Sequence, residues 1–566
     1  KHGEVVAVSG PRSFALVSSL LGVLQSGAVL LSLDPSLPRE RKRVMLAQAK
    51  ATLLVAAGEA AADDLLELPG LHVADSGTLT AGTPLTPCLP ELRPEQPAYV
   101  FFTSGSTGVP KAVLGSQQGL AHFLDWQRNE FQVQATDRAS QLTALSFDVV
   151  LRDMFLALSS GATLCLPQGT DVVDPTHILH WLSQERVSIL HVVPSLARLW
   201  LSCAPAGLSF PALRLVFFAG EPLSDVLVTR FRQVFGAQVQ VVNLYGPTET
   251  TLAKCFARVP TPAAAGVQSI GGPLPQTQVL ILNRQRQLCG LYETGEIAIR
   301  TPFRSLGYLD NPEATERAFV PNPFGADPQD LIYLTGDSGR YRGDGQLEIL
   351  GRMDGQVKVR GVRIEPSEIE AVLGHHAGVR EAVVIARQDE AEAKFLVAYV
   401  VPKTPEAVAQ PAPLLAELRA HLRARLPEVM VPSAFAVLPA LPLNPNGKVD
   451  KKALPAVVRN LEVAPEAAAR SARERELAAL WCDVLGLRDV GVHESFYDLG
   501  GDSLTAIRAV IRMRALGIEE SVCRSILQGH TIAQLASAAE GGTMIAPPGP
   551  DATRRLVLNA LRGLLL

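Results

Sequence analysis

Short runs of β-branched and aromatic residues alternate with helix-like stretches from Glu4 to about Arg300. The runs are Val5–Val8, Tyr99–Phe102, Ile189–Val193, Leu215–Ala219 and Val239–Leu244. Buried strands that are each followed by a helix predict an α/β domain with largely parallel sheets. Two further runs, Gln278–Leu282 and Glu296–Arg300, predict a smaller β-rich part at its end.

With 566 residues the chain is too long for one ordinary domain, and two to four domains are expected. We predict a multidomain α/β protein whose parts, in order, are a large core subdomain (1–350), a small α+β subdomain (351–457), a linker (458–471), an all-α four-helix domain (472–540), and a linker with a C-terminal helix (541–566). In the α+β subdomain, helices are expected at Glu365–Leu373 and Leu414–Leu426, and strands at Glu381–Ile385 and Phe395–Val401. The sequence has no initiator Met and opens almost inside a strand, so we expect a fragment of a longer polypeptide whose core subdomain is truncated at its start.

Composition narrows the function classes. Apolar residues make up 47% and charged residues 19%, which allows large cores. The formal net charge of -4 gives no electrostatic case for nucleic acid as the main partner. Seven scattered cysteines without a CxxC pair fit reduced thiols in a cytoplasmic protein. The longest apolar stretches, such as Ala28–Leu33, are far short of a membrane span.

A Ser/Gly-rich loop, TSGSTGVPK at Thr103–Lys111, follows an apolar run. Its small residues let backbone N–H groups and hydroxyls close around phosphate oxygens, and Lys111 adds positive charge. The loop is not a Walker A sequence, because no Ser or Thr follows the lysine. The alternative is a mobile Ser/Gly turn.

Three later stretches carry polar groups that suit a nucleotide. In NLYGPTET, Thr248 and Glu249 could hold Mg²⁺ through oxygen ligands, although a tight turn before a capped helix is an alternative. In YLTGD, Asp337 is expected after a strand, where it could bind a ribose diol or serve a structural turn. The charged stretch Gly351–Glu365 is either a solvated hairpin or a hinge with bases that face a nucleotide.

A serine is presented by a Gly-Gly turn in FYDLGGDSLTAIR, at Gly500–Ser503, where an apolar, helix-like run begins. No catalytic partner of Ser503 is visible nearby. It suits a carrier attachment site, and the alternative is an N-cap serine in a small helical bundle.

In this order, the motifs resemble the adenylation domains of nonribosomal peptide synthetases, which belong to the ANL adenylate-forming superfamily. The resemblance covers about residues 1–455 and rests on GVLQSGAVLLSLDP, TSGSTGVPKAV, LYGPTETT, YLTGD, GRMDGQVKVRGVRIEPSEIE and LPLNPNGKVDKKALP. FYDLGGDSLTAI is similar to the motif of the peptidyl carrier (thiolation) domain. The family's first motif is missing, as expected for a truncated start.

The resemblance implies an ATP-dependent ligase that activates an amino acid as aminoacyl-AMP and releases pyrophosphate. The aminoacyl group then passes to the thiol of 4′-phosphopantetheine on Ser503, in nonribosomal peptide or mixed peptide/polyketide biosynthesis. The implied cofactors are ATP/AMP, Mg²⁺ and 4′-phosphopantetheine. The implied partners are a phosphopantetheinyl transferase, neighbouring condensation, reductase, ketosynthase or thioesterase domains, and an MbtH-like protein.

The resemblance also assigns roles to residues. Lys448 would contact the substrate carboxylate and the phosphates, Lys358 would be a second catalytic residue, and Asp354 would be the hinge. Glu249 would bind the metal. The implied nucleotide-binding residues are Thr103, Ser104, Gly105, Ser106, Thr107, Gly108, Lys111, Asn243, Tyr245, Gly246, Thr248, Asp337 and Arg352.

In the implied substrate pocket, Asp148 would pair with an α-ammonium group, which favours an amino acid over a fatty or keto acid. The other implied pocket residues are Val149, Arg152, His191, Phe217, Ala219, Gly220, Leu244, Leu252 and Ala253. RDMF and VLGSQQGLAHFLDW are also similar to the α-aminoadipate reductases, some of which carry an additional Arg where Leu252 stands. The absence of this Arg weighs against an acidic substrate, and we expect the substrate amino acid to have an apolar side chain. Arg152 would either face the substrate or form an ion pair with Asp153 or another carboxylate.

Two other functions remain open. One is an acyl- or aryl-acid ligase that loads a carrier or coenzyme A, against which Asp148 argues. The other is an inactive scaffold whose carrier is loaded in trans. The intact set of Lys111, Glu249, Asp337 and Lys448 argues against the scaffold.

Overall fold

The alternating strands and helices fold into two seven-stranded sheets, each parallel at its centre and antiparallel at one edge. The computed structural model describes residues 3–58, 68–76, 90–105, 110–167, 174–205, 207–353, 356–388, 394–442, 449–451, 453–455, 469, 471–485, 487, 489–497, 499, 501, 503–526 and 529–540. Contacts divide the chain into two compact units, one formed mainly by residues 1–365 and one mainly by 366–565. The predicted domain ranges remain predictions.

The first sheet carries the predicted phosphate loop. In order across the sheet its strands are β16 (Gly307–Tyr308), β6 (Lys111–Ser116), β5 (Pro97–Thr103), β2 (Val29–Leu33), β1 (Val5–Ser9), β3 (Leu53–Ala57) and β4 (Gly70–Val73). Helix α1 (Phe14–Gln25) buries Leu16 and Leu20 in the large core on one side, whereas Met45 and Leu46 of α2 (Arg39–Gln48) pack into a separate cluster with Leu31. Because both faces are covered, the central strands β1 and β2 are apolar except for the buried Ser9 and Ser32.

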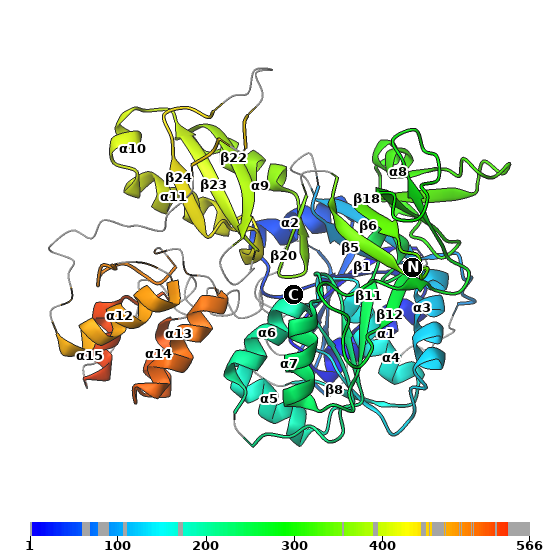
Figure 1. Ribbon diagram of the computed structural model, residues 1–566, viewed down its shortest axis with the longest axis horizontal. Coiled ribbons are helices and arrows are strands. Elements are labelled where there is room, and N and C mark those ends of the chain that lie inside the picture. The colour runs from blue at the N-terminus through cyan, green and yellow to red at the C-terminus, as the bar shows by residue number, and fades with distance from the viewer. Residues whose placement is uncertain are drawn as a thin grey trace. The chain divides into compact units, whose positions relative to one another are not determined.

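The second sheet carries the predicted pocket and metal motifs. Its strands are β13 (Gly272–Pro273), β12 (Cys255–Arg258), β11 (Gln240–Tyr245), β10 (Leu215–Phe218), β9 (Ile189–Val192), β7 (Arg138–Ser140) and β8 (Thr163–Cys165). The accompanying helices are α3 (Gln117–Glu130), α4 (Val149–Ser159), α5 (Pro175–Gln184), α6 (Pro194–Cys203) and α7 (Asp225–Phe235). Figure 1 shows α5, α6 and α7 grouped on one side of β11 and β12, with α3 and α4 on the other.

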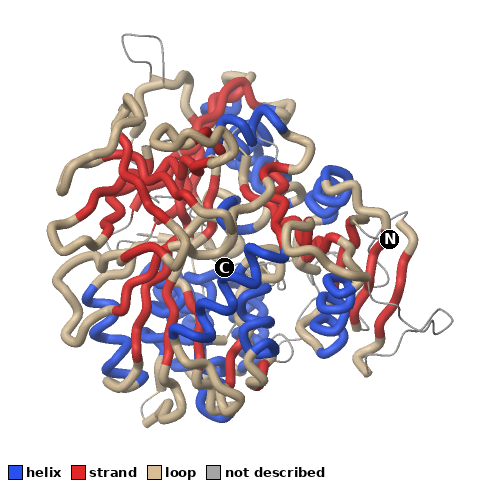
Figure 2. The backbone as a smooth tube through the Cα atoms, turned by 90° about the vertical axis from the view of Figure 1, so that its right-hand side faces the viewer, coloured by secondary structure: helices blue, strands red, loops and turns tan. Residues whose placement is uncertain are grey.

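One apolar core joins the two sheets. It contains Phe101 of β5, Phe217 of β10, Leu20 of α1, Phe123 of α3 and Met154 of α4. Helices α1, α3 and α4 therefore pack against both sheets. Figure 2 shows the helices and strands of the chain in separate colours. The prediction of an α/β domain with largely parallel sheets is confirmed.

A third, antiparallel sheet follows in the same unit, as the β-rich prediction requires. It consists of β14 (Gln278–Leu282), β15 (Gly295–Arg300), β18 (Leu331–Tyr341) and β17 (Phe319–Pro321), with β19 (Leu347–Arg352) paired to β18 and the short helix α8 (Pro312–Ala318) nearby. The hairpin of β20 (Val357–Val359) and β21 (Val362–Ile364) clusters with this unit.

The second unit contains a three-stranded sheet and the predicted helical domain. The sheet consists of β22 (Val379–Gln388), β23 (Lys394–Pro402) and β24 (Ala434–Val437), accompanied by α9 (Pro366–Gly374), α10 (Glu406–Ala409), α11 (Ala412–Arg423) and the 3₁₀ turn η3 (Glu428–Met430). Strand β24 was not predicted, because only four residues of it are extended. The described part of the helical domain has four helices, α12 (Ala472–Leu485), α13 (Ser503–Ala515), α14 (Glu520–Ser525) and α15 (Ile532–Ala539), so the four-helix prediction is confirmed. The predicted C-terminal helix and most of the first linker lie outside the described residues.

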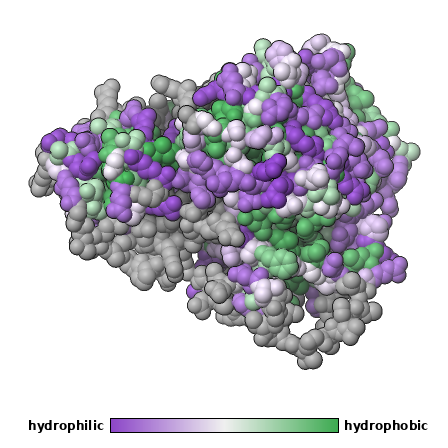
Figure 3. Space-filling view, turned by 90° about the horizontal axis from the view of Figure 1, so that it is seen from below, coloured by the Kyte–Doolittle hydropathy of each residue, from purple (hydrophilic) through white to green (hydrophobic). Residues whose placement is uncertain are grey.

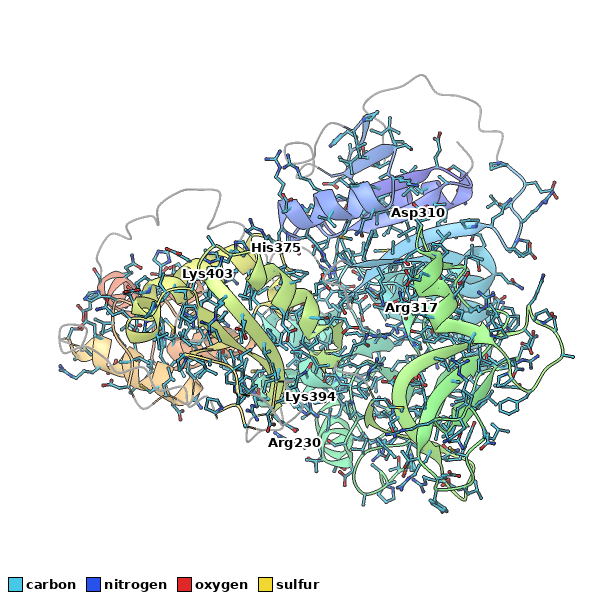
Figure 4. The ribbon with its side chains drawn as sticks, turned by 90° about the horizontal axis from the view of Figure 1, so that it is seen from above. Arg230, Asp310, Arg317, His375, Lys394 and Lys403 are labelled. Carbon is cyan, nitrogen blue, oxygen red and sulfur yellow. The ribbon has the colours of Figure 1, made fainter. Side chains whose placement is uncertain are left out.

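Charged side chains are distributed over the surface. Figure 3 shows hydrophilic and hydrophobic patches interspersed on one face. Six charged or titratable residues labelled in Figure 4, Arg230, Asp310, Arg317, His375, Lys394 and Lys403, are all exposed. Within the described residues, no helix is both long and apolar enough to cross a membrane.

Candidate active site

The predicted phosphate loop is closed by a pair of residues on neighbouring strands. Thr103 ends β5 and stands directly opposite Lys111, which begins β6. Thr103 Oγ1 is buried and has no hydrogen-bond partner among the described residues. Ser104 Oγ donates to the Arg363 carbonyl oxygen at 2.7 Å. Gly105 is described, whereas Ser106, Thr107 and Gly108 are not. A lysine and an unsatisfied hydroxyl at the ends of the loop fit a phosphate group.

Glu249 is buried directly after strand β11, in the 3₁₀ turn η2 (Thr248–Thr250). Its Oε1 accepts a hydrogen bond from Tyr308 Oη at 2.9 Å and lies 3.5 Å from Arg363 Nη1. Its Oε2 is buried without a hydrogen-bond partner among the described residues. Such a carboxylate oxygen, with the Thr248 hydroxyl beside it in sequence, fits Mg²⁺. Since the described residues contain no cluster of three acidic, histidine or cysteine ligands, phosphate oxygens and water would complete the shell.

Asp337 is the centre of a second polar cluster. Its Oδ1 accepts from Arg352 Nη1 at 2.8 Å, and its Oδ2 accepts from Tyr245 Oη at 2.6 Å. Burial, together with the negative charge of Asp337, raises the pKa of Tyr245 far above its usual value. Asp337 was expected after a strand but lies inside β18, because the strand continues to Tyr341 and pairs Asp337 with Arg352 of β19.

The hairpin β20–β21 approaches these clusters with basic residues. Lys358 Nζ lies 5.8 Å from the centre of the Tyr245 ring, and burial lowers the pKa of Lys358. The hairpin turn meets Gly220, where an added Cβ would lie 3.2 Å from the Gly361 Cα, and φ of Gly220 is +86°. Gly220 therefore allows close backbone approach. Lys448 and Asp354, the other predicted catalytic residues, lie outside the described residues.

Asp148 stands at the start of helix α4, but its side chain does not cap the helix. The Leu252 backbone and the Thr248 hydroxyl favour its charged form and so act to lower its pKa. Burial raises its pKa to about 6, against the opposing effect of the Arg152 charge. A buried carboxylate that is turned away from its own helix can bind a cation, such as an α-ammonium group.

Arg152 forms the predicted ion pair with Asp153. Its Nε and Nη2 donate to Asp153 Oδ1 at 3.0 and 2.9 Å, and both side chains are almost fully buried. His191 Nδ1 lies 3.3 Å from the same oxygen, while His191 Nε2 contacts Gln127 Nε2 at 2.8 Å. Burial and the Arg152 charge hold the pKa of His191 well below its usual value. Arg152 and Asp153 are therefore paired, whereas His191 Nδ1 and Gln127 Oε1 are buried without a hydrogen-bond partner among the described residues.

The remaining predicted pocket residues are apolar or small. Phe217, Leu244, Leu252 and Ala253 are buried in one cluster, and Val149 and Ala219 pack against it. Thr251 and Leu252 both have positive φ, +65° and +57°. This turn carries Leu252 and Ala253 back into the core after Glu249.

Asn243 and Gly246 lie on either side of Tyr245. Asn243 is buried and donates from Nδ2 to the Ser269 carbonyl oxygen at 2.9 Å. An added Cβ on Gly246 would lie 2.4 Å from the Leu252 carbonyl oxygen, so only glycine fits beside the turn. The contacts of Asn243 and Gly246 are with the protein itself. Their predicted role in binding the nucleotide stays a prediction.

Sequence reasoning missed Tyr308, Arg363, Gln127 and Lys254. Tyr308 has no local pattern, because it reaches Glu249 only through the pairing of β16 with β6. Arg363 belongs to the basic stretch Gly351–Glu365, whose charges gave a partial signal. Gln127 follows Trp126 at the end of a quoted motif. Lys254 directly follows Ala253, and its burial could not be read from sequence.

Ser503 is the first residue of helix α13, although its side chain lies outside the described residues. The unpaired N–H groups at a helix N-terminus favour a negatively charged group. The position therefore fits the phosphodiester of 4′-phosphopantetheine.

Comparison with known families gives three consecutive matches. The AMP-binding enzyme family matches residues 1–309, the AMP-binding enzyme C-terminal domain matches 368–448, and the phosphopantetheine attachment site family matches 475–538. The family of the first match uses ATP with Mg²⁺, and the domain of the third carries 4′-phosphopantetheine.

Individual relatives agree with this order. The chain is 36% identical to a dimodular nonribosomal peptide synthase of Bacillus subtilis over 94% of its own length, which is 22% of the relative. It is 32% identical to L-2-aminoadipate reductase of Schizosaccharomyces pombe over 91% of its length, which is 42% of the relative. The chain thus spans less than half of either relative.

A solved structure resembles almost the whole chain. It is a holo nonribosomal peptide synthetase protein with adenylation and PCP domains, bound to a vinylsulfonamide inhibitor. The TM-score is 0.77 at 25% identity, and the match covers 98% of this chain and 90% of the other. Since more than half of the chain matches the first family, and the clusters of Glu249 and Asp337 fit its nucleotide, the chain belongs to the AMP-binding enzyme family.

Proposed function

We propose that the chain activates an amino acid with ATP and loads it onto its own carrier domain, as part of nonribosomal peptide biosynthesis. The main support comes from the turn η2 (Thr248–Thr250). The Thr248 hydroxyl favours the charged form of Asp148, and the next residue, Glu249, has a carboxylate oxygen without a hydrogen-bond partner among the described residues. An anchor for an ammonium group and a ligand for Mg²⁺ are thus joined by adjacent residues. The relatives named as nonribosomal peptide synthetases support this assignment.

In the first half-reaction the amino-acid carboxylate attacks the α-phosphate of ATP, and pyrophosphate leaves. Negative charge develops on the transferring phosphoryl group, so preorganised cations and donors lower the barrier. Lys111 and the loop it closes bind the leaving pyrophosphate, Glu249 binds the metal, and Asp337 binds the ribose. Lys448 and Lys358 would neutralise the reacting carboxylate and phosphate.

In the second half-reaction the arm on Ser503 supplies a thiol. A rotation about Asp354 would remove Lys448 and admit that thiol, so that one site serves two steps. The linker over 458–471 keeps the thiol at a high effective concentration without tight docking.

The finer context is also a proposal. A cytoplasmic location follows from the scattered cysteines, and the partners would be a phosphopantetheinyl transferase, flanking synthetase domains and an MbtH-like protein. An acyl- or aryl-acid ligase is the second candidate, since a carboxylate with a raised pKa could also be neutral and accept an uncharged substrate.

Intact-protein mass spectrometry tests the proposal. After treatment with a phosphopantetheinyl transferase and coenzyme A, the chain should gain one arm, and it should gain an aminoacyl group when ATP and an amino acid are added. Ser503→Ala should keep ATP–pyrophosphate exchange but lose all covalent loading, whereas Lys448→Ala should gain the arm but lose exchange. Exchange with carboxylic acids that lack an amino group, at rates equal to amino acids, would support the second candidate instead.

A further inference from the structure

Lys254 is a fully buried lysine that the reaction described above does not use. Its side chain has a relative exposure of 0%, unlike the labelled lysines of Figure 4. Among the described residues, no atom accepts a hydrogen bond from Nζ. A buried charge without a partner costs several kcal/mol, about 3–5 kcal/mol where a partner has been removed. A ligand that supplies a negative charge would remove this cost.

The backbone fixes Lys254 beside the proposed pocket. Its N–H donates to the Tyr245 carbonyl oxygen at 2.7 Å, and its carbonyl oxygen accepts from the Leu274 N–H at 2.9 Å. It directly follows Leu252 and Ala253, and the Leu252 backbone favours the charged form of Asp148. The lysine thus belongs to the same turn that anchors the ammonium group.

Helix α3 lies close enough to Lys254 for its charge to act on a residue of the helix. The positive charge of Lys254 acts on His122 of this helix, and burial with that charge lowers the pKa of His122 to about 4. One turn further on, Trp126 contacts Phe256, and Gln127 contacts His191 of the pocket. Buried Nδ1 of His122 and Nε1 of Trp126 also have no hydrogen-bond partner among the described residues. The seam between α3 and the turn therefore holds nitrogen atoms but no acid that pairs with Lys254.

The charges of the buried set can be balanced one by one. Asp148 is neutralised by the α-ammonium group under the proposed function. Arg152 is neutralised by Asp153, and His191 stays uncharged. Lys254 is the remaining basic group, and it has no partner among the described residues.

We propose that Lys254 recognises the substrate side chain, and that this side chain ends in a carboxylate. This inference rests on the proposed function and replaces the expectation of an apolar side chain. Phe217, Leu244 and Leu252 would contact the methylene groups of such a substrate, which explains why the rest of the pocket is apolar. Burial lowers the pKa of Lys254 to about 7, so the free amine can take up a proton when an anion binds. Arg152 is already paired with Asp153.

ATP–pyrophosphate exchange with matched amino acids tests the inference. The panel contains L-glutamate and L-2-aminoadipate, their neutral counterparts L-glutamine and L-norleucine, and L-leucine. The wild type should prefer an acid over its neutral counterpart by about tenfold or more in kcat/KM. Lys254→Met, which keeps the length of the side chain, should lower kcat/KM for the acid by about 100-fold and leave the neutral amino acids unchanged or improved. Lys254→Arg should retain the acid preference, and the exposed Lys394→Met is the control.

The possible failures can be told apart. If no amino acid supports exchange, the proposed function is wrong. If the wild type prefers leucine or norleucine, or if Lys254→Met keeps the wild-type order, the proposed function stands and the role of Lys254 is wrong. If Lys254→Met does not fold, Lys254→Gln takes its place, with the same expected change of order.

Discussion

The nucleotide side and the amino-acid side of the candidate site hold their charges differently. On the nucleotide side, Glu249 and Asp337 each contact a tyrosine and an arginine, and Glu249 still has an unsatisfied oxygen. On the amino-acid side, Arg152 and Asp153 are adjacent in sequence and neutralise each other, while Lys254 has no partner among the described residues.

This difference separates the binding of the nucleotide, which is the same for every amino acid, from the selection of the amino acid. The nucleotide side holds buried carboxylates, which suit a metal ion and a ribose whatever the amino acid is. The amino-acid side places a self-contained ion pair in the pocket wall and leaves one cation for the ligand. A basic residue in a pocket motif, such as Arg152, is therefore not necessarily the group that binds the substrate side chain.

Breaking the Arg152–Asp153 pair should have the largest effect. Arg152→Leu leaves the Asp153 carboxylate buried without its cation, and about 3–5 kcal/mol of stability should be lost. Thermal unfolding of the variant measures this loss. Arg152→Leu combined with Asp153→Asn should recover much of it, because the amide keeps a hydrogen-bond acceptor for Thr143 without the charge.

The same variants separate Arg152 from Lys254. In the double variant the order of preference among amino acids should match the wild type, even if the overall rate is lower. A change from acidic to apolar substrates in that variant would instead show that Arg152 reads the side chain.

Glu249→Gln should have the next largest effect, on activity. Replacing the carboxylate by an amide removes the charge that would bind Mg²⁺, and ATP–pyrophosphate exchange should fall by about 10²–10³-fold. The loss should be equal for acidic and neutral amino acids, since Glu249 acts on the nucleotide side. Glu313→Gln, at an exposed position of α8, is the matched control. If the Glu249→Gln variant kept the wild-type exchange rate at low Mg²⁺, the metal role of Glu249 would be contradicted.

The sequence predicted the first region better than the second, for a physical reason. Phosphate, ribose and metal sites need particular residue types at fixed turns, so Lys111, Glu249 and Asp337 could be named from local motifs. The fold class followed from strand and helix alternation. Contacts made through the fold were missed in both regions: Tyr308 reaches Glu249 through the pairing of β16 with β6, and Lys254 differs from a surface lysine only by its burial. Pairing and burial are tertiary properties that one local pattern does not contain.

Asp148→Asn should weaken amino-acid substrates by about 1.5–3 kcal/mol in kcat/KM, because a charge-assisted hydrogen bond is lost. The wild-type value should rise as the pH passes through about 6, where Asp148 becomes charged, and the variant should lack this rise. Since burial raises the pKa of Asp148 from 3.8, the folded chain binds this proton more tightly than the unfolded chain, and stability falls as pH rises over that interval. The variant should therefore be more stable than the wild type at pH 7, as thermal unfolding can show.

In the free enzyme, Lys254→Met should raise the unfolding temperature by a few degrees. Burial lowers the pKa of Lys254 from 10.5 to about 7, so the unfolded chain holds this proton more tightly than the folded chain. The cost of burying the ammonium is fully present below pH 7 and is relieved as the pH rises toward 10. The stability difference between variant and wild type should therefore be largest at pH 6 to 7 and smaller at pH 9. His122, with a pKa of about 4, and Cys255, with a pKa of about 12, stay neutral in the folded chain over this interval and do not mask the trend.

Added L-glutamate or L-2-aminoadipate should stabilise the wild type more than the variant, because only the wild type offers the carboxylate a cation. Equal stabilisation of both proteins would return Lys254 to a structural role and leave the nucleotide side as the one region whose charges await a ligand.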